Sequence, residues 1–338
     1  MCWKVFGGRH FEPDRQRRLT SRLAACGAAG GSAEMTGGEC VVARWVGVDC
    51  GYSHMGVAVI DEDGQVLAIE RTHLPRGDGH SRAVALARLN VLLERLNSFA
   101  DIPVWLAGYC YEHSGVLEAF EDTGWTVVGS KALNDVVGIY GLTDMRGNVI
   151  VGGCGSWPQM VYIDKANTVC WPGEDVLADM PAWPLSGRSY AEMLIRLSKR
   201  DDLGDQGSLR QAVYERLGAD SIEQSGDRWG TLGPLMAQVL EYPEVRGFLS
   251  AAADSIAKIR DVVWRYAAID ETPGIVVGGG AVSDEQLWAV LQSEFMSRSV
   301  AVERVEGDPA VGLARFARHN PDADAWAVIG QVRPSWLS

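Results

Sequence analysis

The stretch from Val46 to Ala68, VGVDCGYSHMGVAVIDEDGQVLA, constrains the fold more than any other part of this chain. Apolar residues alternate with a period of two on both sides of a glycine-containing turn, at Val46 and Val48 before it and at Val57 and Val59 after it. This pattern predicts a β-hairpin whose first strand ends at an acidic residue.

The turn of this hairpin has the composition of an anion site. Gly51 permits close approach of a ligand to backbone N–H groups, and Tyr52 and Ser53 add polar groups beside it. Asp49, at the end of the first strand, supplies a carboxylate suited to a hydrated Mg²⁺. An ordinary hairpin, in which the glycines serve only the turn, explains the same residues, so both interpretations stay open.

A second glycine segment lies near the end of the chain. The sequence PGIVVGGGAVSDEQLWAVLQSEF (273–295) predicts a short apolar strand, then Gly278, Gly279 and Gly280, then a helix that opens at Ser283 with acidic residues in its first turn. Its glycine spacing matches neither the dinucleotide fingerprint nor the P-loop, which disfavours a Rossmann fold or a Walker ATPase.

Together, the hairpin and the glycine turn resemble the actin, sugar kinase and chaperone ATPase superfamily. Within it, the residues from about Val46 to Ala317 most resemble a divergent member of the BadF/BadG/BcrA/BcrD-type ATPase and N-acetylglucosamine kinase family. The resemblance implies an α/β fold, the two-lobed actin-like (ribonuclease H-like) ATPase fold, in which each lobe is a mixed sheet flanked by helices. It also implies that the first hairpin binds Mg-ATP through Asp49, Gly51, Tyr52 and Ser53, and that the late glycines, Gly278, Gly279 and Gly280, pack against adenosine.

Three segments between and after these motifs extend the resemblance. KALNDVVGIYG (131–141) is similar to the family's Asn-Asp step before a helix, which implies substrate contacts at Asn134 and Asp135 and a catalytic role for Asp135. GDPAVGLARFA (307–317) is similar to the family's closing helix. NVIVGGCGSW (148–157) resembles the second phosphate segment, with cysteine in place of the family's threonine; the implied ligand residues are Gly153, Cys154, Gly155 and Ser156, with Trp157 beside them as a substrate contact.

Two departures from the family pattern concern catalysis. Family kinases carry a catalytic aspartate after the strand that corresponds to PVWLAGYCYEH (103–113), and here the nearest carboxylate is Glu112. Glu112 is a candidate general base, but it is equally suited to the N-terminus of a helix that begins near Ser114. LGDQGS (203–208) is either a family acidic motif or only a loop that caps the next helix.

Composition narrows the class of protein. The 338 residues are 47% hydrophobic, enough for two domains, and we predict a disordered extension at 1–40, an N-terminal lobe at 41–145, a C-terminal lobe at 146–320 and a tail at 321–338. The net charge of −13 disfavours a nucleic-acid partner. No signal peptide or long apolar run stands out, so we expect a cytoplasmic protein with no membrane partner.

Cysteine, leucine and tryptophan placement gives three further expectations. The seven cysteines form no C-x-x-C pair, which argues for reduced thiols. Helices are predicted from residue 81, with leucines at 89, 92, 93 and 96 on one face, and across 248–266. Residues 171–187 are predicted to be a long loop, and tryptophans 157, 171 and 183 either stack on a sugar or close the core beneath loops.

The predicted function is phosphoryl transfer from ATP, with Mg²⁺, to a hydroxyl of a sugar or amino sugar, as in an N-acetylglucosamine or glucosamine kinase. The resemblance also suggests a homodimer. A catalytically degenerate nucleotide-binding protein with a regulatory or partner role is the main alternative. A resolvase-type nuclease is the third, but it would need converging acidic residues and a basic DNA-binding face.

Overall fold

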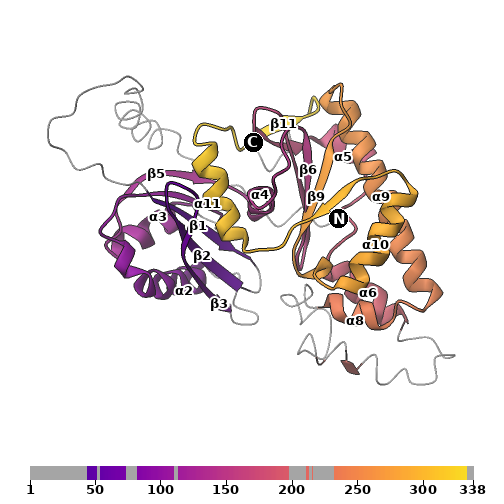
Figure 1. The fold of residues 1–338 in the computed structure, drawn as a ribbon, viewed down its shortest axis with the longest axis horizontal. Helices are drawn as coiled ribbons and strands as arrows, with labels where there is room; N and C mark the ends of the chain where they lie inside the picture. The colour runs from indigo at the N-terminus through magenta and orange to yellow at the C-terminus, as the bar shows by residue number, and fades with distance from the viewer. Residues whose placement is uncertain are drawn as a thin grey trace.

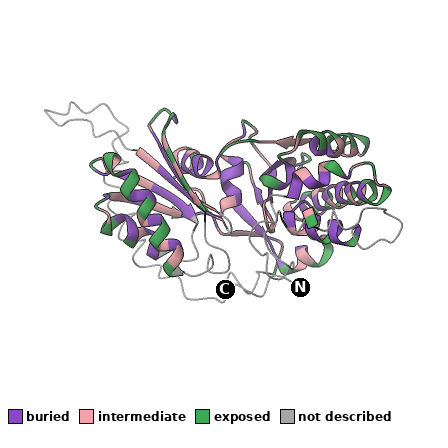
Figure 2. Ribbon diagram, turned by 90° about the horizontal axis from the view of Figure 1, so that it is seen from below, coloured by how far each residue is buried: buried purple, intermediate pink, exposed green. Residues whose placement is uncertain are grey.

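The computed structural model describes residues 44–51, 54–73, 82–109, 113–197, 211–212, 215 and 232–332. Two β-sheets lie side by side, and helices α4 and α11 lie between them (Figure 1). The buried residues follow this plan, since the sheets and the inner helices are buried while the outer helices expose one face (Figure 2).

The first sheet has the strand order β3-β2-β1-β4-β5. Strands β1 to β3 are antiparallel neighbours, and β4 and β5 continue the sheet in parallel from β1. Its strands are β1 (Arg44–Cys50), β2 (His54–Ile60), β3 (Val66–His73), β4 (Val104–Tyr109) and β5 (Val127–Ala132). The predicted hairpin is confirmed, because β1 and β2 pair directly, with Val48 opposite Val57.

Helices α2 (Arg82–Arg95) and α3 (His113–Asp122) cover the outer face of this sheet, and a short 3-10 turn, η1 (Asn97–Phe99), follows α2. The four leucines predicted to share one face of α2 are all buried there. Alternation along β1 sends Val46 and Val48 to this outer core. Gly47 and Asp49 therefore belong to the opposite face, which looks toward α11 and α4.

The second sheet has the order β10-β9-β6-β7-β8-β11 and is also mixed. Its strands are β6 (Val149–Cys154), β7 (Pro158–Ile163), β8 (Val169–Pro172), β9 (Gly274–Gly278), β10 (Val302–Arg304) and β11 (Ala327–Ile329). The helices around it are α5 (Glu174–Asp179), α6 (Gly187–Leu197), α8 (Gly233–Gln238), α9 (Pro243–Ala267) and α10 (Glu285–Ser297), with the 3-10 turn η3 (Gly280–Val282) after β9.

Most sequence-based expectations for this half of the chain are confirmed, with two corrections. The helix predicted across 248–266 is the long α9, with its apolar repeat buried. The helix after the late glycines opens at Glu285, not Ser283, because Asp284 is its N-cap and accepts hydrogen bonds from Gln286 N and Leu287 N. Residues 171–187 are not a continuous loop, since they contain the end of β8 and all of α5.

Close backbone packing joins α4 (Asp135–Tyr140) and α11 (Pro309–His319) to each other and to β1. A Cβ atom on Gly47 would overlap the carbonyl oxygen of Ala310, and one on Gly312 would overlap the carbonyl oxygen of Gly138. These contacts require glycine for reasons of space, independently of backbone dihedral angles. Helix α11 thus lies on the first sheet although it follows β10 of the second (Figure 1).

Polar contacts fasten both ends of α11. At its start, Asp308 is the N-cap, with Oδ1 accepting from Ala310 N at 2.8 Å, and its other oxygen pairs with Arg71 of β3. At its end, the Lys131 ammonium of β5 donates to the carbonyl oxygens of Pro321 and Ala323. Arg318 Nε also donates to Glu62 O in the turn between β2 and β3.

We expect Asp308→Ala to lower the free energy of unfolding by about 1–2 kcal/mol, because the substitution removes the cap of α11. Asp308→Asn keeps an acceptor for Ala310 N and should lose clearly less. Urea unfolding of the three proteins measures the difference. Equal losses in the two variants would contradict a capping role.

The predicted extension, lobe limits and tail stay predictions, and residues 1–43 lie outside the described part of the chain. Among the described helices, none has the length and apolar content needed to cross a bilayer.

Candidate functional site

Asp49, the last residue but one of β1, lies on the face that looks toward α4 and is only 2% exposed. Its Oδ2 lies 3.1 Å from Nε2 of His54, the first residue of β2. The hydrogen bond to Asp49 raises the pKa of His54, while burial acts in the opposite direction. The first hairpin thus holds the Asp49 carboxylate at the inner surface, beside the imidazole of His54.

Asp135 is the first residue of α4, and Asn134 precedes it as the N-cap. The side-chain oxygen of Asn134 accepts from Val136 N at 2.9 Å, and Asp135 Oδ1 lies 3.0 Å from the same nitrogen. This cap explains why the predicted Asn-Asp step begins a helix. Asn134 is 7% exposed, so the cap is built into the interior and not on the surface.

Burial, and after it the negative charge of Asp49, raise the pKa of Asp135 to about 7. The hydrogen bond from Val136 N and the charge of His54 act against this shift. The residue retains some exposed surface although surrounding protein atoms desolvate its carboxyl group. Asp49, His54 and Asp135 therefore form one electrostatically linked group, drawn from β1, β2 and α4.

The second predicted phosphate segment is the turn between β6 and β7, and it also meets α4. A Cβ atom on Gly153 would come within 2.5 Å of Val136 Cγ2, so glycine is needed where the turn passes α4. No protein atom among the described residues lies within 4 Å of a Cβ placed on Gly155. The carbonyl oxygens of Gly155 and Ser156 accept from the first backbone N–H groups of α6, at 2.9 and 3.2 Å, which fixes the turn.

Cys154 is the last residue of β6, directly before this turn, and its side chain is directed into the core around Trp183 and Tyr190. Burial raises the pKa of its thiol to about 12. Any ligand contact at Cys154 therefore has to use its backbone, in contrast to a threonine hydroxyl exposed to a ligand.

We expect Cys154 to be nearly inert to alkylation in the folded protein. A thiol with a pKa of about 12 instead of 9 has roughly 10³-fold less thiolate at neutral pH, and burial blocks access as well. Peptide mapping after iodoacetamide treatment, with and without urea, measures the labelled fraction. Equal labelling in both conditions would show that the thiol is exposed.

The late glycine turn lies against this second turn. Gly279 has φ = 118°, and a Cβ atom there would lie 2.8 Å from the carbonyl carbon of Cys154 and 3.1 Å from Gly155 N. Gly278 packs on Ile139 of α4, and Gly280 begins η3. The sequence motifs at 153–156 and 278–280 are therefore direct neighbours in space.

The tryptophans divide into two groups. Trp171 and Trp183 are 5% exposed and belong to the core, and Trp171 stacks on Trp326 at 5.8 Å between ring centroids. For these two, the alternative of closing the core beneath loops is correct. Trp157 is partly buried, and the Arg188 guanidinium lies 4.8 Å from its ring centroid. Its predicted contact with substrate stays a prediction.

Several predicted residues lie outside the described part of the chain: Tyr52, Ser53, Glu112 and the segment 203–208. Their roles stay predictions. The described site residues that share one inner surface are Asp49, Gly51, Asn134, Asp135 and the glycines of the two other turns.

The sequence analysis did not predict that Asp308 caps α11 and pairs with Arg71, or that His54 pairs with Asp49. The role of Asp308 could have been predicted from the sequence, because an acidic N-cap followed by a proline at the first helical position is a typical helix start. His54 has no such signal, because its link to Asp49 depends on how the hairpin folds.

The arrangement fits a hard divalent cation. Mg²⁺ is usually held by one or two carboxylates together with substrate phosphates and water, and not by a complete protein cage. Asp49 supplies such a carboxylate close enough to Asp135 to shift its pKa, and no cluster of three or more metal-ligating side chains occurs in the described ranges.

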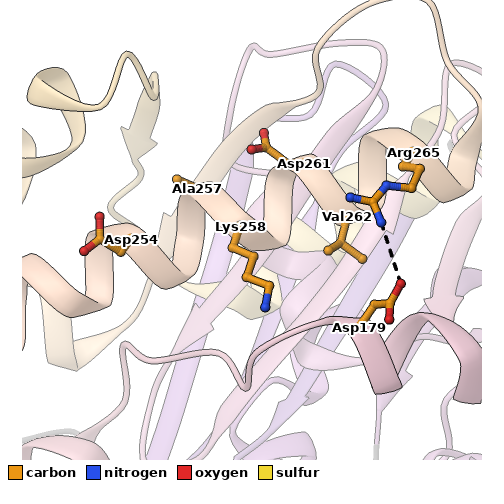
Figure 3. Close-up of a pocket in the computed structure, with 7 residues that line it drawn as sticks. All are labelled: Asp179, Asp254, Ala257, Lys258, Asp261, Val262 and Arg265. Carbon is orange, nitrogen blue, oxygen red and sulfur yellow. Dashed lines mark ion pairs between the residues drawn. The ribbon is translucent and has the colours of Figure 1, made fainter.

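A separate depression of about 520 Å³ lies on α9 and α5 (Figure 3). Charged side chains line it, including Lys258 and Arg265, and Arg265 pairs with Asp179 at 3.7 Å. None of the predicted site residues belongs to α5 or α9. This depression is therefore separate from the candidate site.

Several solved structures have folds similar to that of this chain. A protein from Porphyromonas gingivalis assigned as an N-acetylglucosamine kinase matches 82% of this chain and 99% of its own, with 17% identity and a TM-score of 0.58. A ROK family glucokinase from Streptomyces griseus, in complex with glucose and AMPPNP, matches 82% of this chain and 99% of its own, with 16% identity and a TM-score of 0.55. A ROK family transcriptional regulator, a homologue of the E. coli MLC protein, matches 83% of this chain and 79% of its own, with 12% identity and a TM-score of 0.52.

The chain matches no protein-family model and no curated protein sequence. The predicted fold is confirmed: two mixed sheets flanked by helices, in the arrangement of actin-like ATPase-fold sugar kinases. At these identities the likeness carries the fold alone. The BadF/BadG affiliation stays a prediction.

Proposed function

We propose that this protein is a phosphotransferase that uses Mg-ATP to phosphorylate a hydroxyl of a sugar or amino sugar. The observation that carries the proposal is Asp135, a carboxylate with a pKa of about 7 beside the charge of Asp49 and next to two glycine turns. A general base works best when its pKa is close to the working pH. The solved glucokinase with glucose and AMPPNP supports the substrate class.

In this proposal Asp135 accepts the proton of the acceptor hydroxyl as the hydroxyl oxygen attacks phosphorus. Asp135 replaces the aspartate that the sequence lacks after β4, so Glu112 is not needed as the base. Asn134 fixes the start of α4 and thus the direction of the Asp135 carboxylate. Positioning and charge stabilisation supply most of the acceleration in phosphoryl transfer, which matches a site with few reactive side chains.

Asp49 and the backbone N–H groups of Gly51, Gly153, Gly155 and Ser156 would hold the metal and the phosphates, and Gly278, Gly279 and Gly280 would pack against adenosine. Bound Mg²⁺ would neutralise charge that develops on the transferred phosphoryl group.

A regulatory, non-catalytic protein is the second candidate, favoured by the likeness to a ROK family transcriptional regulator. In that case the same turns would bind a ligand without turnover.

Calorimetry with Mg-ATP, followed by ADP release with a panel of hexoses, hexosamines and N-acetylhexosamines, tests the two candidates. Sugar-stimulated ADP release together with a phosphorylated sugar detected by mass spectrometry is the expected result. Binding of nucleotide or sugar without any phosphorylated product would contradict the kinase and favour the regulator. Absence of binding to both ligands would contradict both.

A further inference from the structure

One polar atom near the site is buried without a partner. Gln159, on β7, pairs with Gly153 of β6 across the second hairpin. Its carboxamide oxygen is buried, and no described residue donates a hydrogen bond to it. A buried acceptor left unpaired costs about 1–3 kcal/mol, so a ligand that reaches it with a donor gains free energy. Several side chains in the described part of the chain have a buried, unpaired polar atom, and that of Gln159 lies next to the predicted phosphate segment.

The side chain of Gln159 leaves the sheet on the face that carries α4. A Cβ atom on Gly153 would lie 3.6 Å from Gln159 Cβ and 2.5 Å from Val136 Cγ2, which brings these two side chains together. Val136 N is the same group that contacts the side-chain oxygens of Asn134 and Asp135. Gln159 therefore lies against the first turn of α4, next to the residue that follows Asp135.

The chemistry of the unpaired atom selects the ligand. A carboxamide oxygen only accepts hydrogen bonds, so its partner must carry a proton. Ionised phosphate oxygens are acceptors and do not match it, whereas sugar hydroxyls and amide N–H groups are donors. Gln159 lies between the proposed phosphate turn, at Gly153, and the residue that follows the proposed base, at Val136. Of the ligands that could reach this position, the acceptor sugar has the donor groups that match its unpaired oxygen.

We infer that Gln159 is a specificity-determining residue whose carboxamide oxygen accepts a hydrogen bond from a hydroxyl or N–H group of the acceptor sugar, next to the hydroxyl that is phosphorylated. This inference rests on the proposed kinase function. Sites built to bond a substrate OH or NH discriminate strongly against analogues that lack it, because the protein atom is then left buried and unpaired.

The test combines a substitution in the protein with a deletion in the substrate. Gln159→Met keeps the length of the side chain and removes the acceptor; Gln292→Met, on an exposed position of α10, is the matched control. Sugar KM and kcat, ATP KM and sugar binding by calorimetry are measured with the parent sugar and its monodeoxy or deamino analogues.

For the wild type and the Gln292→Met control, we expect one analogue to lose about tenfold or more in kcat/KM. In Gln159→Met, kcat/KM for the parent sugar should fall by a similar factor, mostly through a higher sugar KM, while ATP KM stays unchanged. With the sensitive analogue, kcat/KM of Gln159→Met should be only slightly lower than its value with the parent sugar. If the effects of the substitution and of the deleted sugar group on kcat/KM do not add, the Gln159 carboxamide and that sugar group are hydrogen-bonded to each other.

An unchanged sugar KM in Gln159→Met, or equal losses for the analogues in both proteins, would overturn the inference while the kinase function stands. In that case the substitution should only raise the thermal midpoint, because it removes an unpaired polar atom. Wild-type protein that neither binds nor phosphorylates any sugar overturns the proposed function and this inference with it.

Discussion

Asp135→Asn should lower kcat for sugar phosphorylation by about 10²–10⁴-fold, the usual contribution of a positioned general base. Asparagine keeps the size of the side chain and an oxygen near Val136 N, but it cannot take a proton. Sugar and nucleotide dissociation constants should change little. Activity within a few-fold of wild type would reject Asp135 as the base and return attention to Glu112.

The same residue predicts the pH dependence of the wild-type enzyme. Asp135 must be deprotonated to act as a base, and its pKa is raised to about 7. The value of kcat/KM should therefore rise with pH through about 7 and then level off, and a profile from pH 5.5 to 8.5 measures it. A profile that is flat across this range would contradict the proposed role.

The free energy of unfolding of Asp135→Asn, compared with wild type at several pH values, shows whether the variant is folded. In the unfolded chain the carboxyl ionises near pH 3.8, and in the folded chain only near 7, so the folded state holds a proton that the unfolded state has lost between these values. The free energy of unfolding therefore falls as pH rises from about 4 to 7, because the folded state then has to give up the proton on Asp135 or keep it at a growing cost. Asp135→Asn removes the penalty and should be the more stable protein at pH 8, even while it is inactive.

Gly312→Ala should destabilise the protein by about 3 kcal/mol or more, because the added Cβ atom would overlap the carbonyl oxygen of Gly138 in α4. Backbone atoms cannot move aside as a flexible side chain can, so α11 would have to separate from α4. Urea unfolding measures the loss, and a variant that does not fold is the extreme of the same result.

Gly247→Ala in α9 is the matched control, since this glycine is also helical but has no described atom within 4 Å of its Cβ position. It should stabilise the protein by about 0.5–1 kcal/mol, the difference between alanine and glycine within a helix. A loss at Gly312 no greater than about 1 kcal/mol would show that the two helices are less tightly packed than described.

The parts of this fold that could be predicted from sequence are those with local causes. Alternation at Val46 and Val57 predicts the first hairpin, and apolar spacing predicts α2 and α9. Asn134 before Asp135 predicts a capped helix start. Each of these features depends on residues within one or two turns of each other.

The features that could not be predicted depend on distant contacts. The raised pKa of Asp135 results from burial between distant elements and from the charge of Asp49 on β1. The burial of the Cys154 side chain results from Trp183 and Tyr190, which follow it on other elements. The unpaired oxygen of Gln159 is visible only once the surrounding atoms are placed.

The position of α11 sets the order in which the protein can be completed during synthesis. The first sheet is finished at Ala132, yet the helix that covers its inner face begins at Pro309. At 5–20 residues per second, the ribosome needs on the order of ten seconds or more to make the intervening chain. During that time the inner face of the nascent sheet, including Gly47 and Asp49, is not covered by α11. A chaperone that shields apolar surface would have its largest effect in this interval.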